Sequence, residues 1–250
     1  MIVYFSKEVQ CEKQRPDEEG KKMENINAKE IKDRVRELGA CLCGIAPVER
    51  FADAPSGFHP ADILKGCKSV IVVALRFPIS TLSSPSQAAY TFVRNKLMDR
   101  MDSITFQIAA ELEAAGGSAV PVPSSDPYDF WDESRRHGQG ILSLKHAAVR
   151  AGLGRMGKNT LLVNDTFGNM LWLGAVVSDQ QLEADPVADY AACAPECRVC
   201  LDNCPVAALD GTTIVQRKCR EISAKYTEGG GGVYACNLCR KLCPNYNGIK

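Results

Sequence analysis

Hydrophobic residues in the first part of the chain recur with two different periods. A polar cap at Asn27, with Glu30 three residues later, precedes apolar positions spaced by three or four residues, which predicts a helix that ends at Gly39. Its apolar positions are Ile31, Val35 and Leu38. The run 69–75 is continuous and β-branched, so we expect a strand that is buried on both faces at the centre of a sheet.

The longest helical pattern extends from Tyr90 to Leu112 and stops at Gly116 and Gly117. Its apolar stripe consists of Tyr90, Val93, Leu97, Met101, Ile104, Ile108 and Leu112. A stripe of this kind packs against a core more often than it binds a cofactor, so we assign it to packing.

A second group of elements is expected after residue 140. A short helix is predicted over 143–150, and a glycine-rich loop over 152–157 follows it. The apolar runs 160–163 and 170–177 flank a turn-like segment at 165–168, which indicates a loop followed by a β-hairpin.

Composition limits the class of protein. The 250 residues are 45% hydrophobic and 24% charged, which is typical of one or two globular domains. Thirty Lys and Arg balance thirty Asp and Glu, which argues against a surface built for nonspecific nucleic-acid binding. No apolar run reaches the roughly 20 residues of a membrane span, and the chain opens without a secretory signal, so we expect a cytoplasmic protein with no membrane contact. Residues 1–22 are polar and aperiodic, and we expect them to be disordered or to precede a true start at Met23.

The chain contains twelve cysteines, which in a reducing compartment favours metal ligation over disulfides. Four are scattered, at Cys11, Cys41, Cys43 and Cys67. The other eight crowd into the last part of the chain, which predicts a separate metal-binding module. They are Cys193, Cys197, Cys200, Cys204, Cys219, Cys236, Cys239 and Cys243.

Two of the cysteine runs end in x3-Cys-Pro, at Pro205 and at Pro244. In ferredoxin-type runs the closely spaced thiolates bind one [4Fe-4S] cluster and the cysteine before proline binds the other. By this logic one cluster is held by Cys193, Cys197, Cys200 and Cys243. The second is held by Cys204, Cys219, Cys236 and Cys239. Two zinc sites are the alternative, because Cys-x2-Cys steps also suit zinc, although zinc ribbons have no reason to share the proline-terminated continuation.

The glycine-rich loop imitates two nucleotide motifs. Gly152, Gly154 and Gly157 satisfy the pattern G-x-G-x-x-G, and Lys158 nearly completes a phosphate-binding loop. Both interpretations fail on context, because those motifs follow a strand and begin a helix, whereas a helix precedes here. Asn159 also replaces the hydroxyl residue that binds Mg²⁺. A turn whose glycines permit positive φ is the plainer interpretation.

Six cations and no carboxylate occupy residues 134–164 around this loop. They are Arg135, Arg136, Lys145, Arg150, Arg155 and Lys158. They form either a solvated face or, together with the glycine amides, a site for a phosphate-bearing ligand.

The run 145–162, the dipeptides 167–168 and 173–174, and the cysteine spacing resemble epoxyqueuosine reductase, whose relatives include the corrinoid-dependent reductive dehalogenases. The resemblance extends from about residue 25 to the end and is specific across 145–243. It implies an α/β (α+β) fold in which a nitroreductase-like domain, 23–185, binds cobalamin beside a ferredoxin-like module with two [4Fe-4S] clusters, 186–250.

The resemblance also implies that the glycine loop lines the corrinoid pocket, where glycines admit the macrocycle and cations meet its phosphate. The residues carried over on this basis are Gly152, Gly154, Gly157, Lys158, Asn159 and Thr160. Cobalamin would perform the difficult chemistry, fed with single electrons through the clusters by an external low-potential donor of the ferredoxin or flavodoxin kind.

One position departs from the family. A catalytic Asp lies shortly before the helix that leads into the glycine loop of epoxyqueuosine reductase, and an ungapped alignment places Gly138 there. Candidates for a substitute acid are Asp126, Tyr128 and His137, with Asp129 and Glu133 nearby, although each is also typical of a turn or surface residue.

The resemblance implies reduction of epoxyqueuosine in tRNA, and two other functions stay open. The C-terminal helical repeats of longer family members are missing, which makes tRNA a less secure partner. Gly138 favours a ferredoxin-like electron carrier or reductive activator without a substrate of its own. A corrinoid-dependent reductase of another small molecule, including a dehalogenase, is the third interpretation.

Overall fold

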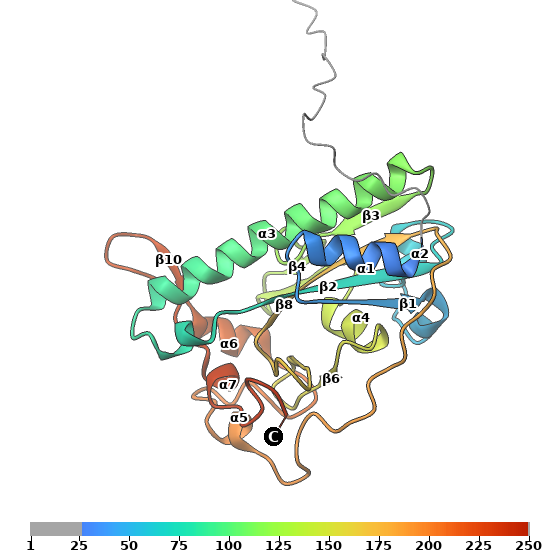
Figure 1. Cartoon of the computed structure of the whole chain (residues 1–250). Coiled ribbons are helices and arrows are strands. Elements are labelled where there is room, and N and C mark those ends of the chain that lie inside the picture. The colour runs from blue at the N-terminus through green and yellow to red at the C-terminus, as the bar shows by residue number, and fades with distance from the viewer. Residues whose placement is uncertain (1–26, 250) are drawn as a thin grey trace, which may run out of the picture.

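A four-stranded antiparallel sheet lies at the centre of the molecule, with the strand order β1-β2-β8-β3 (Figure 1). The computed structural model describes residues 27–249, so the expectation for residues 1–22 lies outside the described residues. The strands are β1 Leu42–Pro47, β2 Ser69–Arg76, β8 Leu171–Ser178 and β3 Ala119–Val122.

Strand β2 confirms the predicted buried central strand. It pairs with β1 on one side and β8 on the other, and seven of its eight residues are buried. Because side chains alternate along a strand, β2 contributes to two separate hydrophobic cores. One core takes Val70, Val72 and Ala74, and the other takes Ile71, Val73 and Leu75.

Helices cover both faces of the sheet (Figure 1). Helices α1 (Ala28–Glu37) and α3 (Gln87–Ala114) pack on the face of Ile71, and α4 (Leu144–Arg150) packs on the face of Val72. All three predicted helices are confirmed. The Asn27 side chain accepts a hydrogen bond from the Glu30 amide at 2.9 Å. The α3 stripe is buried, as predicted, at Met101, Ile104, Ile108 and Leu112.

The predicted hairpin of the runs 160–163 and 170–177 is wrong. The first run forms β7 (Leu162–Val163), which turns back to pair with β6 (Arg155–Met156), and the second forms β8 in the central sheet. In the described chain the segment between the two runs contains an isolated bridge, from Asn164 to Gly168. The hairpin does not form because β8 pairs with β2 along one edge and with β3 along the other, which leaves no edge for the first run.

The remaining elements are short. Between β1 and β2, helix α2 spans Pro60–Ile63 and begins at a proline. A small hairpin precedes α4 and consists of β4 (Phe130–Asp132) and β5 (His137–Gln139). The cysteine-rich segment lies mostly below the sheet in Figure 1, with β10 beside α3. It contains α5 Val199–Asp202, α6 Gln216–Ser223, β9 Ala224–Tyr226, β10 Gly232–Tyr234 and α7 Leu238–Lys241.

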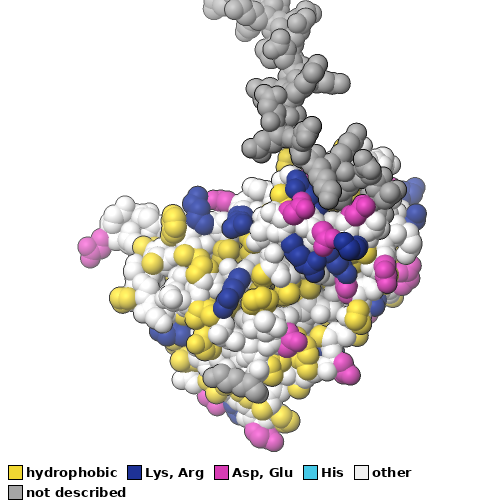
Figure 2. Space-filling view, in the orientation of Figure 1, with side chains coloured by type: hydrophobic (Ala, Val, Ile, Leu, Met, Phe, Trp, Pro, Cys, Tyr) yellow, Lys and Arg dark blue, Asp and Glu magenta, His cyan; other side chains and the backbone are white. Residues whose placement is uncertain are grey.

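The surface agrees with the balanced charge of the sequence. Acidic and basic side chains intersperse on the face shown in Figure 2, with hydrophobic side chains between them. None of the helices in residues 27–249 has the length and apolar character needed to cross a membrane.

Replacing Met101 by Ala should test the packing of α3 on the sheet. The Met101 side chain is fully buried and lies where a Cβ on Gly174 of β8 would stand, so its removal leaves a cavity. We expect a loss of about 2–5 kcal/mol in the free energy of unfolding, measured by urea denaturation. The control is Phe106→Ala on the same helix, where the side chain is 67% exposed and the loss should stay below about 1 kcal/mol. Equal losses in the two variants would contradict this packing.

Candidate functional site

The four cysteines that the sequence assigns to the first cluster, Cys193, Cys197, Cys200 and Cys243, lie near enough to one another to interact by charge. Burial raises the pKa of the Cys200 thiol, and the thiolates of Cys193, Cys243 and Cys197 raise it further. Burial also raises the pKa of Cys243, again with contributions from Cys193 and Cys197. Cys200 lies in α5 and Cys243 follows α7, and these two short helices pack together.

The other four cysteines form a second group. Burial raises the pKa of Cys219 in α6, and the neighbouring thiolates of Cys236 and Cys204 raise it further. Burial raises the pKa of Cys239 in α7 to about 11. The Arg240 guanidinium opposes that shift, while the thiolates of Cys219, Cys236 and Cys200 add to it. The interaction between Cys239 and Cys200 shows that the two groups adjoin.

The grouping is looser than the cage of a single ion. Within residues 27–249 no three His, Cys, Asp or Glu side chains converge closely enough to enclose one metal ion. The arrangement therefore consists of two sets of four neighbouring thiols in buried or half-buried positions.

The glycine loop is packed against the chain itself. A Cβ on Gly152 would stand 2.1 Å from the Pro186 carbonyl oxygen, and one on Gly154 would stand 2.5 Å from the Val163 carbonyl oxygen. Gly152 also has a φ of +76°, a conformation that favours glycine. The glycines are thus required for close backbone contacts within the protein, which is the plainer interpretation of the motif.

Lys158 and Asn159 of this loop face the cysteine-rich segment. The Lys158 Nζ donates hydrogen bonds to the carbonyl oxygens of Ala194, Pro195 and Cys197, at 3.4, 2.5 and 2.9 Å. The Lys158 amide lies 3.5 Å from the Cys193 sulfur. Asn159 is 3% exposed, and its Nδ2 donates to the Cys239 carbonyl oxygen at 3.0 Å. The loop therefore contacts both groups of cysteines.

Protein groups engage most of the cations that surround the loop in sequence. Arg150 pairs with Asp53, and its Nε donates to the Arg50 carbonyl oxygen at 2.6 Å. Arg135 pairs with Asp132 at 3.5 Å. Arg155 donates to a backbone carbonyl, as Lys158 does. Arg150, Arg155 and Lys158 therefore do not form a free cationic surface, whereas the side chain of Arg135 is 81% exposed.

Gly138 is required by an aromatic neighbour. It lies in β5 opposite Trp131 of β4, and a Cβ there would stand 2.7 Å from the Tyr128 ring. Gln216 of α6 fixes the same residue twice, since it accepts from the Gly138 amide at 3.1 Å and donates to the Gly138 carbonyl oxygen at 3.0 Å. A larger side chain, such as the Asp of the family pattern, would displace Tyr128.

Arg220 completes this contact between the hairpin and α6. Its NH2 group donates to the Tyr128 hydroxyl oxygen at 3.0 Å. Its guanidinium lies 5.4 Å from the Tyr128 ring centre and 5.1 Å from that of Trp131, and the two rings stack at 6.0 Å. Cation–π contacts of this kind favour a fixed arrangement of the rings.

All three candidate acids lie in or beside this region. Burial raises the pKa of Tyr234, and the Arg94 cation lowers it at a ring distance of 4.0 Å. Asp126 and Tyr128 also act on Tyr234 by charge, so they lie near it. His137 is the residue before Gly138 in β5, opposite Asp132.

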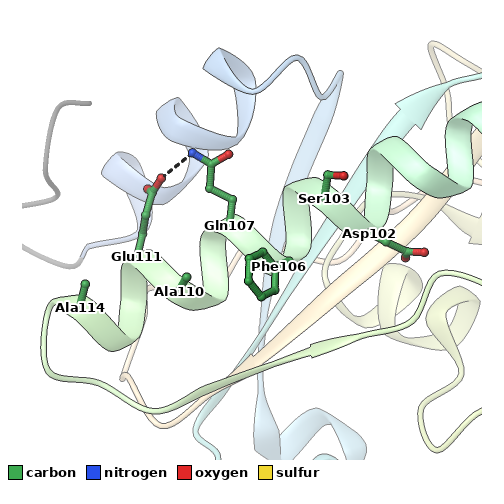
Figure 3. Close-up of a pocket in the computed structure, with 7 residues that line it drawn as sticks. All are labelled: Asp102, Ser103, Phe106, Gln107, Ala110, Glu111 and Ala114. Carbon is green, nitrogen blue, oxygen red and sulfur yellow. Dashed lines mark hydrogen bonds between the residues drawn. The ribbon is translucent and has the colours of Figure 1, made fainter. Parts of the chain in front are cut away.

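Hollows in the described surface lie elsewhere. Figure 3 shows one on the outer face of α3, lined by Asp102, Ser103, Phe106, Gln107, Ala110, Glu111 and Ala114. None of these residues belongs to the site predicted from the sequence.

Comparison with known proteins gives the family. An epoxyqueuosine reductase from Pseudomonas aeruginosa is 30% identical over 264 residues, which cover 87% of this chain and 68% of that protein. The chain belongs to the epoxyqueuosine reductase family. The epoxyqueuosine reductase of Leadbetterella byssophila is 24% identical over 87% of this chain and 79% of its own length. No family model matches the chain.

Solved structures of the epoxyqueuosine reductase fold agree with the model. The enzyme from Streptococcus thermophilus superposes with a TM-score of 0.60 at 21% identity, over 88% of this chain and 66% of that one. A catabolic reductive dehalogenase in complex with 3-bromo-4-hydroxybenzoic acid gives a TM-score of 0.64 at 20% identity, over 88% of this chain and 32% of the dehalogenase chain. The mixed α/β class is confirmed. The chain spans less than two thirds of several relatives, with 31% of the protein from Staphylococcus aureus matched.

Sequence reasoning missed three contributors to this epoxyqueuosine reductase-like site, namely Gln216, Arg220 and Arg240. The available signal was position, because Arg220 follows Cys219 and Arg240 follows Cys239 directly. A cation beside a cysteine is a natural counter-charge for its thiolate.

Replacing Gly138 by Ala should disturb the hairpin. The added Cβ meets the Tyr128 ring, so we expect a loss of about 1–3 kcal/mol in the free energy of unfolding, with part of it recovered in the double variant Gly138→Ala, Tyr128→Ala. Gly140→Ala is the matched control, because its Cβ would have 3.7 Å to the nearest atom. The contact with Tyr128 is refuted if both single variants unfold alike.

Proposed function

We propose that the chain is an iron–sulfur reductase of the epoxyqueuosine reductase type. The observation that carries the proposal is the gathering of eight cysteines into two sets of four in a member of this family. An eight-thiol donor set suits two [4Fe-4S] clusters, which transfer electrons one at a time.

The proposed ligands follow the two groups. One cluster is assigned to Cys193, Cys197, Cys200 and Cys243, and the other to Cys204, Cys219, Cys236 and Cys239. The protein contributes N–H groups near the sulfurs, since the Ala208 amide lies 3.2 Å from the Cys204 sulfur and the Lys158 amide lies near Cys193. Hydrogen bonds of this kind tune the potentials of iron–sulfur clusters.

Cobalamin is proposed as a second cofactor on the strength of the family alone. A solved dehalogenase neighbour is described as having a B12-dependent mechanism, at 22% identity and a TM-score of 0.60. The glycine loop does not fit as the corrinoid pocket, however. Gly154, Gly157, Asn159 and Thr160 are buried and a Cβ on Gly152 would meet a backbone oxygen, so these residues pack against the protein itself and not around a macrocycle. We therefore propose that this loop supports the cysteine-rich segment, which Lys158 and Asn159 contact.

Tyr128 is the proton donor that we propose in place of the missing Asp. Its hydroxyl oxygen accepts from Arg220, so its own proton is free for a substrate, and the cation stabilises the phenolate that forms. Opening an epoxide to an alkene consumes two electrons and two protons and releases water, so a proton donor is needed. Asp126 is a surface residue near the same place, and we rank it second.

A nucleic-acid substrate is the proposed partner. A solved epoxyqueuosine reductase neighbour binds an epoxyqueuosine-modified tRNA stem loop, at 18% identity. In this chain Phe130 and Trp131 of β4 are each 46% exposed, and the side chain of Arg135 is 81% exposed. Exposed aromatic rings beside cations are typical of surfaces that stack unpaired bases. The external electron donor is proposed to be a ferredoxin or flavodoxin-like protein.

The second candidate function is an electron carrier without its own substrate. Gly138 favours it, because an ungapped alignment places this residue at the family's acid and its neighbour Tyr128 excludes a larger side chain. A dehalogenase-like reductase of another small molecule rests on the dehalogenase fold of a solved neighbour.

Oxygen-free reconstitution separates these functions. We expect about eight irons per chain and retention of cobalamin through gel filtration, since two four-iron clusters and one corrinoid are proposed. Cys41→Ser, which changes a cysteine outside both groups, is the control and should keep all eight irons. Eight irons without retained cobalamin would favour the carrier, and zinc in place of iron would overturn the cluster assignment.

Tyr128→Phe tests the proton donor. We expect the holoprotein variant to lose about 10²–10⁴-fold in the rate of epoxyqueuosine reduction in tRNA while its iron content stays unchanged, because the change removes the phenolic hydroxyl and keeps the ring. Tyr226→Phe is the control, since that side chain is 82% exposed, and it should keep the wild-type rate. A Tyr128→Phe variant as fast as wild type would exclude this tyrosine as the acid. A wild-type chain that fails to restore queuosine in a strain lacking its reductase would indicate another substrate.

A further inference from the structure

Lys158 lies at the junction between the glycine loop and the first group of cysteines. Its Nζ has three hydrogens, and the structure gives it three backbone acceptors, the carbonyl oxygens of Ala194, Pro195 and Cys197. All three acceptors belong to the segment between Cys193 and Cys197, which are two proposed ligands of the same cluster. One ammonium group thus holds the backbone of a whole ligand loop.

The charge of Lys158 is not neutralised by a carboxylate. Within the described residues Lys158 forms no ion pair, whereas Arg198, which follows Cys197, pairs with Asp202 at 3.1 Å. The charge of a half-buried ammonium whose partners are backbone carbonyls acts on nearby anions with less screening than an exposed charge does. The nearest proposed anionic centre is the cluster of Cys193 and Cys197.

The position of this charge is fixed by its own loop. Gly157 and Leu161 close the turn with a hydrogen bond of 2.9 Å, and Thr160 donates its amide to Gly157 at 2.9 Å. Asn159, which follows Lys158, donates a hydrogen bond to the carbonyl oxygen of Cys239, a member of the second group. The turn is therefore anchored at both groups, and Lys158 has little freedom to move away from the first.

From this geometry we propose that Lys158 is a positioning residue for the first cluster, where its hydrogen bonds hold the loop of Cys193 and Cys197 and its charge raises the reduction potential of that cluster. The proposal rests on the proposed iron–sulfur function. Reduction adds an electron and makes a cluster more negative, so a fixed cation stabilises the reduced form. Removing the cation makes that cluster harder to reduce.

Three substitutions separate charge from structure. Lys158→Arg keeps the charge and the donors, Lys158→Gln keeps donors for the carbonyls without the charge, and Lys158→Met removes both. Lys29→Met is the matched control, because it removes a lysine charge from an α1 side chain that is 85% exposed. The measurement is the reduction potential of each cluster in the reconstituted protein, followed by electron paramagnetic resonance, together with iron content.

We expect Lys158→Gln to keep eight irons and to shift the reduction equilibrium of one cluster about tenfold toward its oxidised form, which equals about 59 mV for one electron. The other cluster should shift by less than about threefold, and Lys158→Arg and Lys29→Met should match wild type. Lys158→Met should show the same shift or lose the iron of one cluster. A Lys158→Gln variant with eight irons and unchanged potentials would overturn the proposal while leaving the proposed function intact. Fewer than eight irons in the wild-type protein would overturn both.

Discussion

Like charges placed side by side away from water repel each other, and the cysteine-rich segment gathers eight groups that must lose their protons to bind metal. Burial already raises the pKa of the thiols in both sets, so the metal-free segment favours neutral thiols. The segment has little else to hold it together. Among residues 190–249 the buried apolar side chains are Ala192, Cys200, Ala208 and Cys243. A positively charged metal between the thiolates would supply cohesion that the small core lacks, which couples folding of this segment to metal binding.

The sheet-forming part of the chain is organised differently, and the two parts meet through polar contacts and through Tyr246, which packs against the buried cluster of Phe77, Leu82 and Met170. Two hydrophobic cores enclose the sheet, and the glycine loop leaves this body to donate hydrogen bonds into the ligand loops. The glycines allow the approach, because any side chain at Gly152 or Gly154 would strike a backbone oxygen. The same loop spacing that imitates a nucleotide motif is thus explained by contacts within the protein.

Periodicity in the sequence predicted the elements whose stability is local or is set by simple burial. The Asn27 cap, the β2 run and the α3 stripe carry their structure in their own residues, and the cysteine spacing predicted which thiols would be neighbours. The path after Thr160 was mispredicted because the partners of β8, namely β2 and β3, lie far away in the sequence. The contacts of Gly138 with Tyr128 and Gln216 were equally out of reach, since they depend on how the hairpin meets a helix 78 residues further on. The role of Lys158 also escaped prediction, because backbone carbonyls leave no trace in the sequence.

Helix α6 belongs to two neighbourhoods at once. Gln216 and Arg220 form hydrogen bonds with Gly138 and Tyr128, in and beside the hairpin of β4 and β5. Cys219, which lies between them, is a thiol of the second set. With barely two turns of helix, α6 cannot rearrange one side independently of the other. Any ligand that displaces Tyr128 or Trp131 must therefore either break those contacts or shift Cys219, so the aromatic hairpin and the second set of thiols are mechanically coupled.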